Sequence, residues 1–244
     1  MSASLDPALD QLVVANRILA HEDVVDGFGH ISIRHPERPD RYFLSRSRSP
    51  QLVTRADLVE FHLDNRPVEA QQQRLYAERP IHGSLYVARP DVMSVCHNHA
   101  HSVIPYGVTD TFIRPILHMG AVIGEQVPIW DIRHEFGDTH LLVVTNEQGD
   151  SLARTVGANR CALMRGHGAV TVGRTVQETV FTAIYLMVNA KLLFDAKQIG
   201  GQINYLTPGE VKIAAETLLS PLSQERAWEY WSARAGFPPG AKVV

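Results

Sequence analysis

The stretch VMSVCHNH, residues 92–99, is a compact apolar run that ends in His97-Asn98-His99. Its length and composition predict a buried strand. Because side chains alternate between the two faces of a strand, His97 and His99 project from the same side, within reach of one metal ion, whereas Cys96 and Asn98 point the other way. Histidines also satisfy hydrogen bonds in protein cores, so this pair alone does not separate a metal site from a structural role.

A third histidine stands in Arg165-Gly166-His167-Gly168, between two glycines at a predicted strand junction. Glycines there let the backbone approach a ligand closely. Three neutral imidazoles with an open coordination position are typical of a catalytic metal centre, whereas a structural zinc site would more often recruit cysteine. We therefore expect His97, His99 and His167 to hold one divalent metal ion, and zinc, manganese, cobalt and iron all accept such ligands.

Short strands and helices are predicted on both sides of this stretch. Strand character appears at 30–34, 41–45, 58–64, 141–145, 160–166 and 169–173. Helical spacing or helix-start signals appear at 7–21, 80–88, 148–156, 175–199, 207–219 and 221–235. This order predicts an α/β fold with a mixed sheet and helices outside it. With no repeat or long linker, we expect a single domain over residues 1–244 that ends in a helical extension at about 207–244.

Composition excludes several classes of protein. The 244 residues are 45% hydrophobic and 20% charged, which is enough to bury a core. Lys plus Arg number 23 against 26 Asp plus Glu, so the net charge of −3 offers no basic excess for nucleic acid or an anionic membrane. Cys96 and Cys161 lie in apolar stretches and are expected to be reduced core thiols. With no signal-like segment at residues 1–12 and no apolar run of about 20 residues, we expect a soluble, cytoplasmic protein.

The other histidines and one glutamate are harder to interpret. His82 and His118 stand in apolar contexts, which favours either buried hydrogen bonding or ligand contact. His101 is either a loop residue or a group that supports a metal ligand. Glu78 is either a carboxylate stabilised at a helix start or an acid/base group beside the metal. Surface positions are expected for His21, His35, His62, His134 and His140.

Glu78, the tyrosine of SLYVARPDV, VCHNH and MRGHGAVTVG, in that order, resemble the class II aldolase and adducin family. The resemblance runs from the first predicted helix to about Leu206. It implies a three-layer α/β/α domain with a central, mainly antiparallel sheet, assembled as a homotetramer with active sites between subunits. It also implies one divalent metal ion per subunit on His97, His99 and His167, with Glu78 as proton donor and acceptor.

The chain departs from the sugar-phosphate aldolases of that family at the positions that hold the phosphate. These positions read Gly29-His30, Ser45-Arg46 and Tyr76-Ala77, which removes an asparagine and the hydroxyls before the glutamate. A phosphorylated sugar is therefore disfavoured. Arg46 and Arg48 could instead clamp carboxylates, or be solvated loop residues. Candidate substrate-binding residues are His30, Ser45, Arg46, His82 and His118.

Segments such as GHISIR, FLSRSRSPQLVT, AERPIHGSLY and LMRGHGAV are similar to the decarboxylase branch of the family. Its members act on hydroxylated aromatic dicarboxylates such as 3-hydroxy-2-methylpyridine-4,5-dicarboxylate or 3,4-dihydroxyphthalate. The resemblance thus implies a metal-dependent lyase of aromatic compound catabolism, with a small anionic substrate and Mn2+ or Zn2+, or else Co2+ or Fe2+. The alternatives are an aldolase or dehydratase on a hydroxy-carbonyl or sugar-phosphate substrate, and a non-catalytic adducin-like assembly module.

Overall fold

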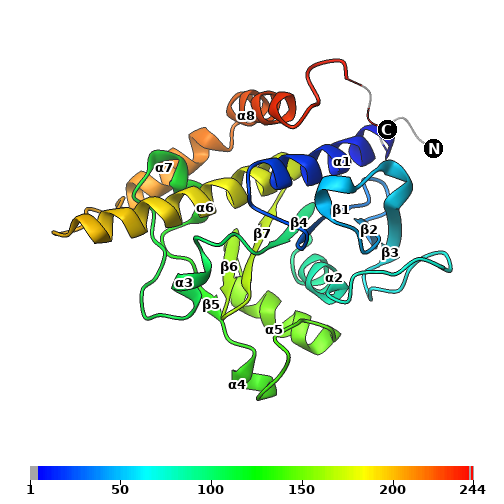
Figure 1. The fold of residues 1–244 in the computed structure, drawn as a ribbon, viewed down its shortest axis with the longest axis horizontal. Helices are drawn as coiled ribbons and strands as arrows, with labels where there is room; N and C mark the ends of the chain where they lie inside the picture. Colours follow the sequence, from blue (N-terminus) through cyan, green and yellow to red (C-terminus); the bar gives the residue numbers. More distant parts are fainter. Residues whose placement is uncertain (1–4, 242, 244) are drawn as a thin grey trace.

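A seven-stranded sheet runs through the middle of the computed structural model, which describes residues 5–241 and 243 (Figure 1). Its strands are β1 (His30–Arg34), β2 (Arg41–Ser45), β3 (Leu58–His62), β4 (Ser94–Asn98), β5 (Ile129–Trp130), β6 (Cys161–Met164) and β7 (Gly168–Gly173). Their order across the sheet is β3-β2-β1-β4-β7-β6-β5. Every neighbouring pair is antiparallel except β5 and β6, so the expected mainly antiparallel sheet is confirmed.

Helices cover both faces of the sheet (Figure 1). On one face lie α1 (Leu5–His21) and the long α6 (Val176–Ile199), and on the other lie α2 (Arg79–Ala88) and α5 (Asn146–Val156). α7 (Pro208–Leu218) packs against the short helix η3 (His118–Ile123), and α8 (Pro221–Arg234) packs against α1 and α6. The remaining short helices are η1 (Pro50–Leu52), η2 (Arg55–Asp57), α3 (Ile104–Gly107) and α4 (Arg133–Phe136).

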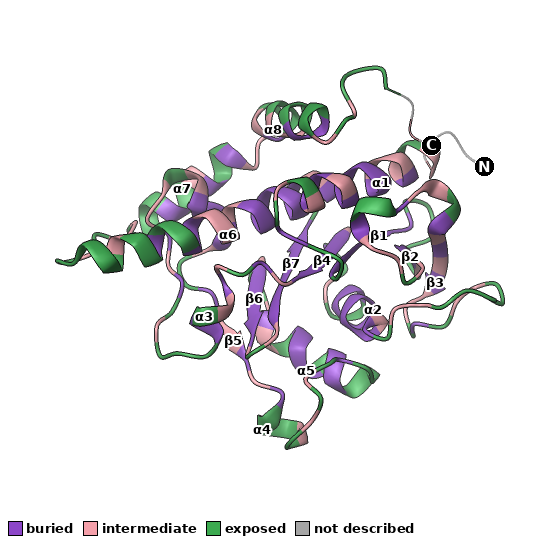
Figure 2. Cartoon of the chain, in the orientation of Figure 1, coloured by how far each residue is buried: buried purple, intermediate pink, exposed green. Residues whose placement is uncertain are grey.

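Alternation along the central strands divides the buried side chains between two cores. On β4, Cys96 joins the core under α1 and α6, and its neighbour Val95 joins the core under α2 and α5. On β7, Ala169 and Val170 divide in the same way. Both cores are apolar, and β4, β6 and β7 are buried throughout (Figure 2). The three-layer α/β/α arrangement expected from the sequence is therefore confirmed.

The strand predicted at residues 141–145 is wrong, because this segment is a loop. Leu141 has a φ of 68°, which ends any extended run there. The amide of Val143 donates to Oε1 of Glu78 at 3.0 Å, and the amide of Val144 donates to Oε1 of Gln148 at 2.8 Å. Side-chain carbonyl and carboxylate oxygens thus take the hydrogen bonds that a neighbouring strand would have taken.

The strand that does stand beside β6 is β5, Ile129–Trp130, which the sequence pattern did not predict. Two residues carry no periodic signal. Other predicted elements hold their positions with changed ends: the strand predicted at 160–166 spans Cys161–Met164, and that at 58–64 spans Leu58–His62. The predicted tail at 207–244 contains α7 and α8, while residues 242 and 244 lie outside the described part.

α6 is the longest helix in the described part of the chain. By length and composition it is apolar enough to cross a membrane, but 56% of the relevant window is buried inside the fold. It packs on β4 and β7 and against α1 (Figure 2). We therefore interpret it as a core helix.

Candidate metal centre and active site

Strand β4 positions two histidines at its end. His97 is fully buried on the same face as Val95, and His99 is the first residue after the strand. Their ring centroids lie 4.7 Å apart. The side-by-side placement expected from the H-x-H spacing is therefore present, and Cys96 points into the opposite core.

His167 is brought to this pair by the turn between β6 and β7. Gly166 has a φ of 66°, which favours glycine. A Cβ on Gly168 would lie 2.1 Å from the carbonyl oxygen of Asn98, so only glycine lets this turn approach β4 so closely. The His167 ring centroid consequently lies 4.8 Å from that of His97 and 5.0 Å from that of His99. One nitrogen of each histidine lies within 4.8 Å of the others.

Glu78 completes the cluster from the N-terminus of α2. Its Oε2 lies 3.5 Å from Nε2 of His97 and 3.8 Å from Nε2 of His167. Its Oε1 accepts the hydrogen bond from the Val143 amide. Burial raises the pKa of Glu78 to about 7, although that amide hydrogen bond opposes the rise. At neutral pH the carboxyl group can therefore both hold and release a proton.

The three imidazoles suit a divalent cation. His97 donates from Nδ1 to the Ala169 carbonyl oxygen at 3.1 Å, which leaves the lone pair of Nε2 free. Nε2 of His97, Nε2 of His99 and Nδ1 of His167 are buried and make no hydrogen bond within the described residues. A cation between the rings would satisfy Nε2 of His97 and Nε2 of His99, and His167 turns its own Nε2 toward Glu78 Oε2 at 3.8 Å. Burial, the main cause, lowers the pKa of all three histidines, that of His167 to about 4, so each ring is a neutral ligand at pH 7.

His30 stands beside this cluster on β1, opposite His97 in the strand pairing. Its ring centroid lies 5.2 Å from that of His97 and 4.5 Å from that of Tyr76. Tyr76 was not predicted as a site residue, although it stands two residues before Glu78, at a position that holds the phosphate in the sugar-phosphate aldolases. Ser45 is buried at the end of β2 and interacts with the Tyr76 hydroxyl.

His82 does not face the cluster as a substrate-binding residue should. It is fully buried, with Nε2 2.7 Å from Nδ1 of His30 and Nδ1 2.6 Å from Oγ of Ser32. Because both ring nitrogens bind protein groups, His82 has none left for a substrate. The expected direct contact is therefore corrected to a position behind His30.

Arg46 and Arg48 converge on a buried carboxylate that sequence reasoning missed. Nε of Arg46 lies 2.6 Å from Oδ1 of Asp57, and Nη1 of Arg48 lies 3.0 Å from Oδ2. Burial by itself would raise the pKa of Asp57, but hydrogen bonds from Thr54, Arg46 and Arg48 lower it to about 2. Each arginine is therefore bound to Asp57 through part of its guanidinium group. The other N–H groups of each guanidinium remain available to a ligand.

Two other histidines differ from expectation. His118 opens η3 and is exposed, so the buried position that its apolar context favoured is wrong. His35 was expected at the surface but is buried, because its Nδ1 accepts hydrogen bonds from the amides of Glu37 and Arg38. The neighbours of these two histidines in the sequence therefore did not predict whether their side chains are buried.

A cavity of about 830 Å³ opens beside His99. Its polar lining is mainly acidic, with Asp23, Asp26 and Asp195 against Lys191. These acidic side chains would repel an anionic group from this cavity.

The family follows from a comparison with known proteins. Residues 10–194, which include Glu78 and the three clustered histidines, match the family described as Class II Aldolase and Adducin N-terminal domain. The chain belongs to the class II aldolase and adducin family. The family expected from the ordered motifs is thereby confirmed.

Within the class II aldolase and adducin family, decarboxylases are among the similar proteins. The chain is 35% identical over 237 residues to decarboxylase tropJ of Talaromyces stipitatus, covering 88% of each chain. It is 27% identical over 242 residues to a 3,4-dihydroxyphthalate decarboxylase of Arthrobacter keyseri, covering 93% of each. Among solved structures, an aldolase II superfamily protein from Pseudomonas syringae matches with a TM-score of 0.80 at 18% identity, covering 96% of this chain and 94% of the other. That likeness shows the shared class II aldolase fold.

Proposed function

We propose that this protein is a divalent-metal-dependent carbon–carbon lyase that decarboxylates a hydroxylated aromatic dicarboxylate of the hydroxypyridine-dicarboxylate or dihydroxyphthalate type. The observation that carries the proposal is the cluster of three neutral imidazoles, with His97 buried and Glu78 Oε2 3.5 Å from it. The similarity to proteins named as decarboxylases supports this choice of reaction. The aromatic substrate in the name 3,4-dihydroxyphthalate decarboxylase makes aromatic compound catabolism the proposed context.

The proposed metal ligands are His97, His99 and His167, with Mn2+ or Zn2+ as the first candidates and Co2+ or Fe2+ next. A bound divalent ion supplies a Lewis acid that withdraws electron density from the reacting part of the substrate. The chain's own part is to hold three rings neutral and Glu78 close to them.

Glu78 is the proposed catalytic residue. When the bond between the ring carbon and a carboxylate breaks, CO2 leaves and the electron pair stays on the ring carbon. Protonated Glu78 then delivers its proton to that carbon and is reprotonated from solvent. Burial, which raises the pKa of Glu78 to about 7 in the metal-free protein, favours the protonated form that this step needs.

The carboxylate that stays on the ring is proposed to lie on the β2 side of the cluster. Ser45, Arg46 and His30 offer hydrogen-bond donors there, and Asp57 holds Arg46 in place. A bidentate guanidinium or a hydroxyl suits a carboxylate, and this chain lacks the hydroxyl pair before Glu78 that suits a sugar phosphate.

We further propose a cytoplasmic homotetramer formed from single-domain subunits, with active sites at subunit interfaces. Apolar and exposed residues on α6, including Leu192 and Phe194, support a contact with another copy. The cavity beside His99 continues to Leu192, so a neighbouring subunit at this place would close one side of the site.

Metal content and product analysis test the function together. The purified protein is loaded with Mn2+ or Zn2+ and incubated with 3,4-dihydroxyphthalate or with a ketose phosphate. We expect CO2 release from the aromatic dicarboxylate alone. Aldehyde release from the ketose phosphate would replace the decarboxylase by an aldolase.

The metal site is tested separately by His99→Ala. We expect this variant to lose at least tenfold in metal affinity, measured by elemental analysis after dialysis, because one of three ligands is gone. His101→Ala is the matched control, since His101 is an exposed histidine two residues away. Wild-type protein without about one ion per subunit would favour the non-catalytic assembly module.

A further inference from the structure

A chain of four buried side chains runs from the metal cluster into the core. Nδ1 of His30 lies 2.7 Å from Nε2 of His82, and Nδ1 of His82 lies 2.6 Å from Oγ of Ser32. Ser32 Oγ in turn lies 2.7 Å from the Tyr86 hydroxyl. None of the four side chains is more than 3% exposed. Hydrogen bonds to solvent therefore do not determine which atom is the donor at each contact between these four side chains.

Counting protons leaves one direction for the chain. Ser32 and Tyr86 carry one hydroxyl proton each, and Tyr86 has no hydrogen-bond acceptor other than Ser32 Oγ among the described residues. Tyr86 therefore donates to Ser32, because an unpaired buried donor costs about 1–3 kcal/mol. Ser32 has only one further partner, Nδ1 of His82, so its own proton goes there. His82 must then carry its proton on Nε2 and donate it to Nδ1 of His30.

The reverse direction fails by the same count. If His30 donated from Nδ1 to His82, His82 would donate to Ser32 and Ser32 to Tyr86, and the Tyr86 proton would have no acceptor. A mixed arrangement, with His82 and Tyr86 both donating to Ser32, leaves the Ser32 proton unpaired. Burial lowers the pKa of His82 to about 3, so His82 is neutral and carries a single ring proton at pH 7.

We propose that Tyr86, Ser32 and His82 are positioning residues that hold His30 in the tautomer with its proton on Nε2, and that this N–H binds a negatively charged oxygen of the substrate. The two nitrogens of an imidazole point to opposite edges of the ring, so Nε2 is directed away from His82. The ring packs against His97 and Tyr76, and among the described residues its hydrogen-bond partners are His82 at Nδ1 and its own backbone. The donor is thus offered beside the three clustered histidines.

The proposed tautomer gives His30 a role distinct from that of Glu78. A neutral imidazole N–H is a good hydrogen-bond donor to a carboxylate but a very weak acid. His30 therefore selects an anionic oxygen, and proton delivery stays with Glu78. The tautomer follows from the hydrogen bonds alone, whereas the identity of the bound anion rests on the proposed function.

The tautomer is measured by 15N NMR on the Zn2+-loaded protein with 15N-labelled histidine, in which the His30 signals are assigned with His30→Gln. We expect a protonated Nε2 and an unprotonated Nδ1 on His30. Ser32→Ala removes the donor to His82 and should move the His30 proton to Nδ1 or produce a mixture. Ser94→Ala is the matched control. Ser94 is an equally buried serine that donates to the Ser32 backbone carbonyl and has no hydrogen bond to any of the four side chains.

Tyr86→Phe gives a second variant if Ser32→Ala does not fold, and should also produce a mixture of His30 tautomers. A wild-type His30 protonated on Nδ1, or an unchanged tautomer in the folded variants, would overturn the proposed positioning. This result does not depend on turnover, so it is distinguishable from a failure of the proposed function.

Anion binding is tested with phthalate, an aromatic dicarboxylate without ring hydroxyls, by calorimetry. We expect Ser32→Ala to weaken phthalate binding about tenfold and Ser94→Ala to leave it within twofold. Wild-type protein that does not bind phthalate, or equal binding by Ser32→Ala, would contradict the anion-binding role of His30.

Discussion

Glu78 illustrates a conflict between stability and chemistry at the level of one side chain. The carboxyl group is buried beside three histidines, and burial raises its pKa from an ordinary value near 4.5 to about 7. The unfolded chain has no such burial. Between pH 4.5 and 7 the unfolded state therefore releases a proton that the folded state retains, and raising the pH favours unfolding of the metal-free protein.

We therefore expect Glu78→Gln to stabilise the metal-free protein at high pH. The gain should be near zero at pH 5 and about 1–3 kcal/mol at pH 8, where the buried charge of the wild type is fully developed. Urea unfolding at the two pH values measures it, and Glu125→Gln, an exposed glutamate, is the control. The same variant should retain metal and lose turnover. A Glu78→Gln protein that cannot hold metal would make this carboxylate a ligand first.

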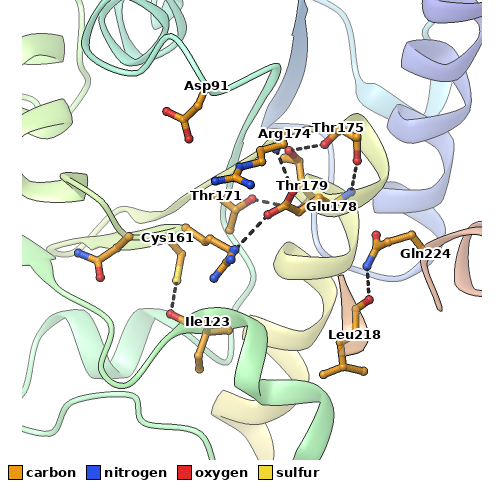
Figure 3. A network of polar contacts seen from close by, with 12 residues as sticks. Asp91, Ile123, Cys161, Thr171, Arg174, Thr175, Glu178, Thr179, Leu218 and Gln224 are labelled. Atoms are coloured by element: carbon orange, nitrogen blue, oxygen red, sulfur yellow. Dashed lines mark hydrogen bonds and ion pairs between the residues drawn. The ribbon is translucent and has the colours of Figure 1, made fainter. Parts of the chain in front are cut away.

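At the scale of elements, the junction of β7 and α6 fixes the end of the sheet opposite to His167. Thr175 caps α6 by accepting from the Glu178 amide at 3.0 Å. Glu178 Oε2 accepts from the Arg174 amide at 3.0 Å and Oε1 from Nε of Arg160 at 3.0 Å (Figure 3). Thr179 donates to the Ser94 carbonyl at 3.2 Å, which ties α6 to the start of β4. These contacts set the angle at which the helix crosses the sheet.

Thr175→Ala should cost about 1 kcal/mol of stability, because it removes the hydroxyl that satisfies an end amide of α6. Metal binding should not change, since the site lies at the other end of β7. Thr217→Ala is the control: its exposed hydroxyl bonds only within α7, and we expect a change below about 0.5 kcal/mol. Equal urea midpoints for Thr175→Ala and wild type would show that the cap contributes nothing.

At the scale of the molecule, α6 has one side packed in the core and another side exposed to solvent. One side is buried against the sheet, and its C-terminal half exposes Leu192, Phe194 and Ile199. The next helix, α7, also exposes an apolar side chain, Ile213. These exposed apolar side chains fit association with another copy.

Phe194→Asp should shift the proposed tetramer toward smaller species at micromolar concentration, because a charge replaces an apolar side chain in the contact. Light scattering after gel filtration measures the mass. Leu222→Asp, at a still more exposed apolar position on α8, is the control and should leave the mass unchanged. A monomeric wild type would remove the proposal of sites shared between subunits.

Local patterns predicted much of the fold and part of the site. The helix start at Thr207 and Glu210 appears as predicted, with each side chain accepting from the other's amide, because a cap uses residues three apart. The strand at 141–145 failed, since its apolar letters could not show that Glu78 and Gln148 would take its amides. A hydrogen bond between residues 65 positions apart leaves no periodic trace.

Local sequence was enough to predict that His97 and His99 share one face and to show that His167 stands between two glycines. Both follow from local geometry: the two-residue period of a strand and the conformational freedom of glycine. The folded chain was needed to show that Glu78 lies 3.5 Å from His97 and that His82 is hydrogen-bonded to His30. Both contacts depend on which strands pair and on which buried polar atoms still need a hydrogen-bond partner. Strand pairing and burial are properties of the whole folded chain.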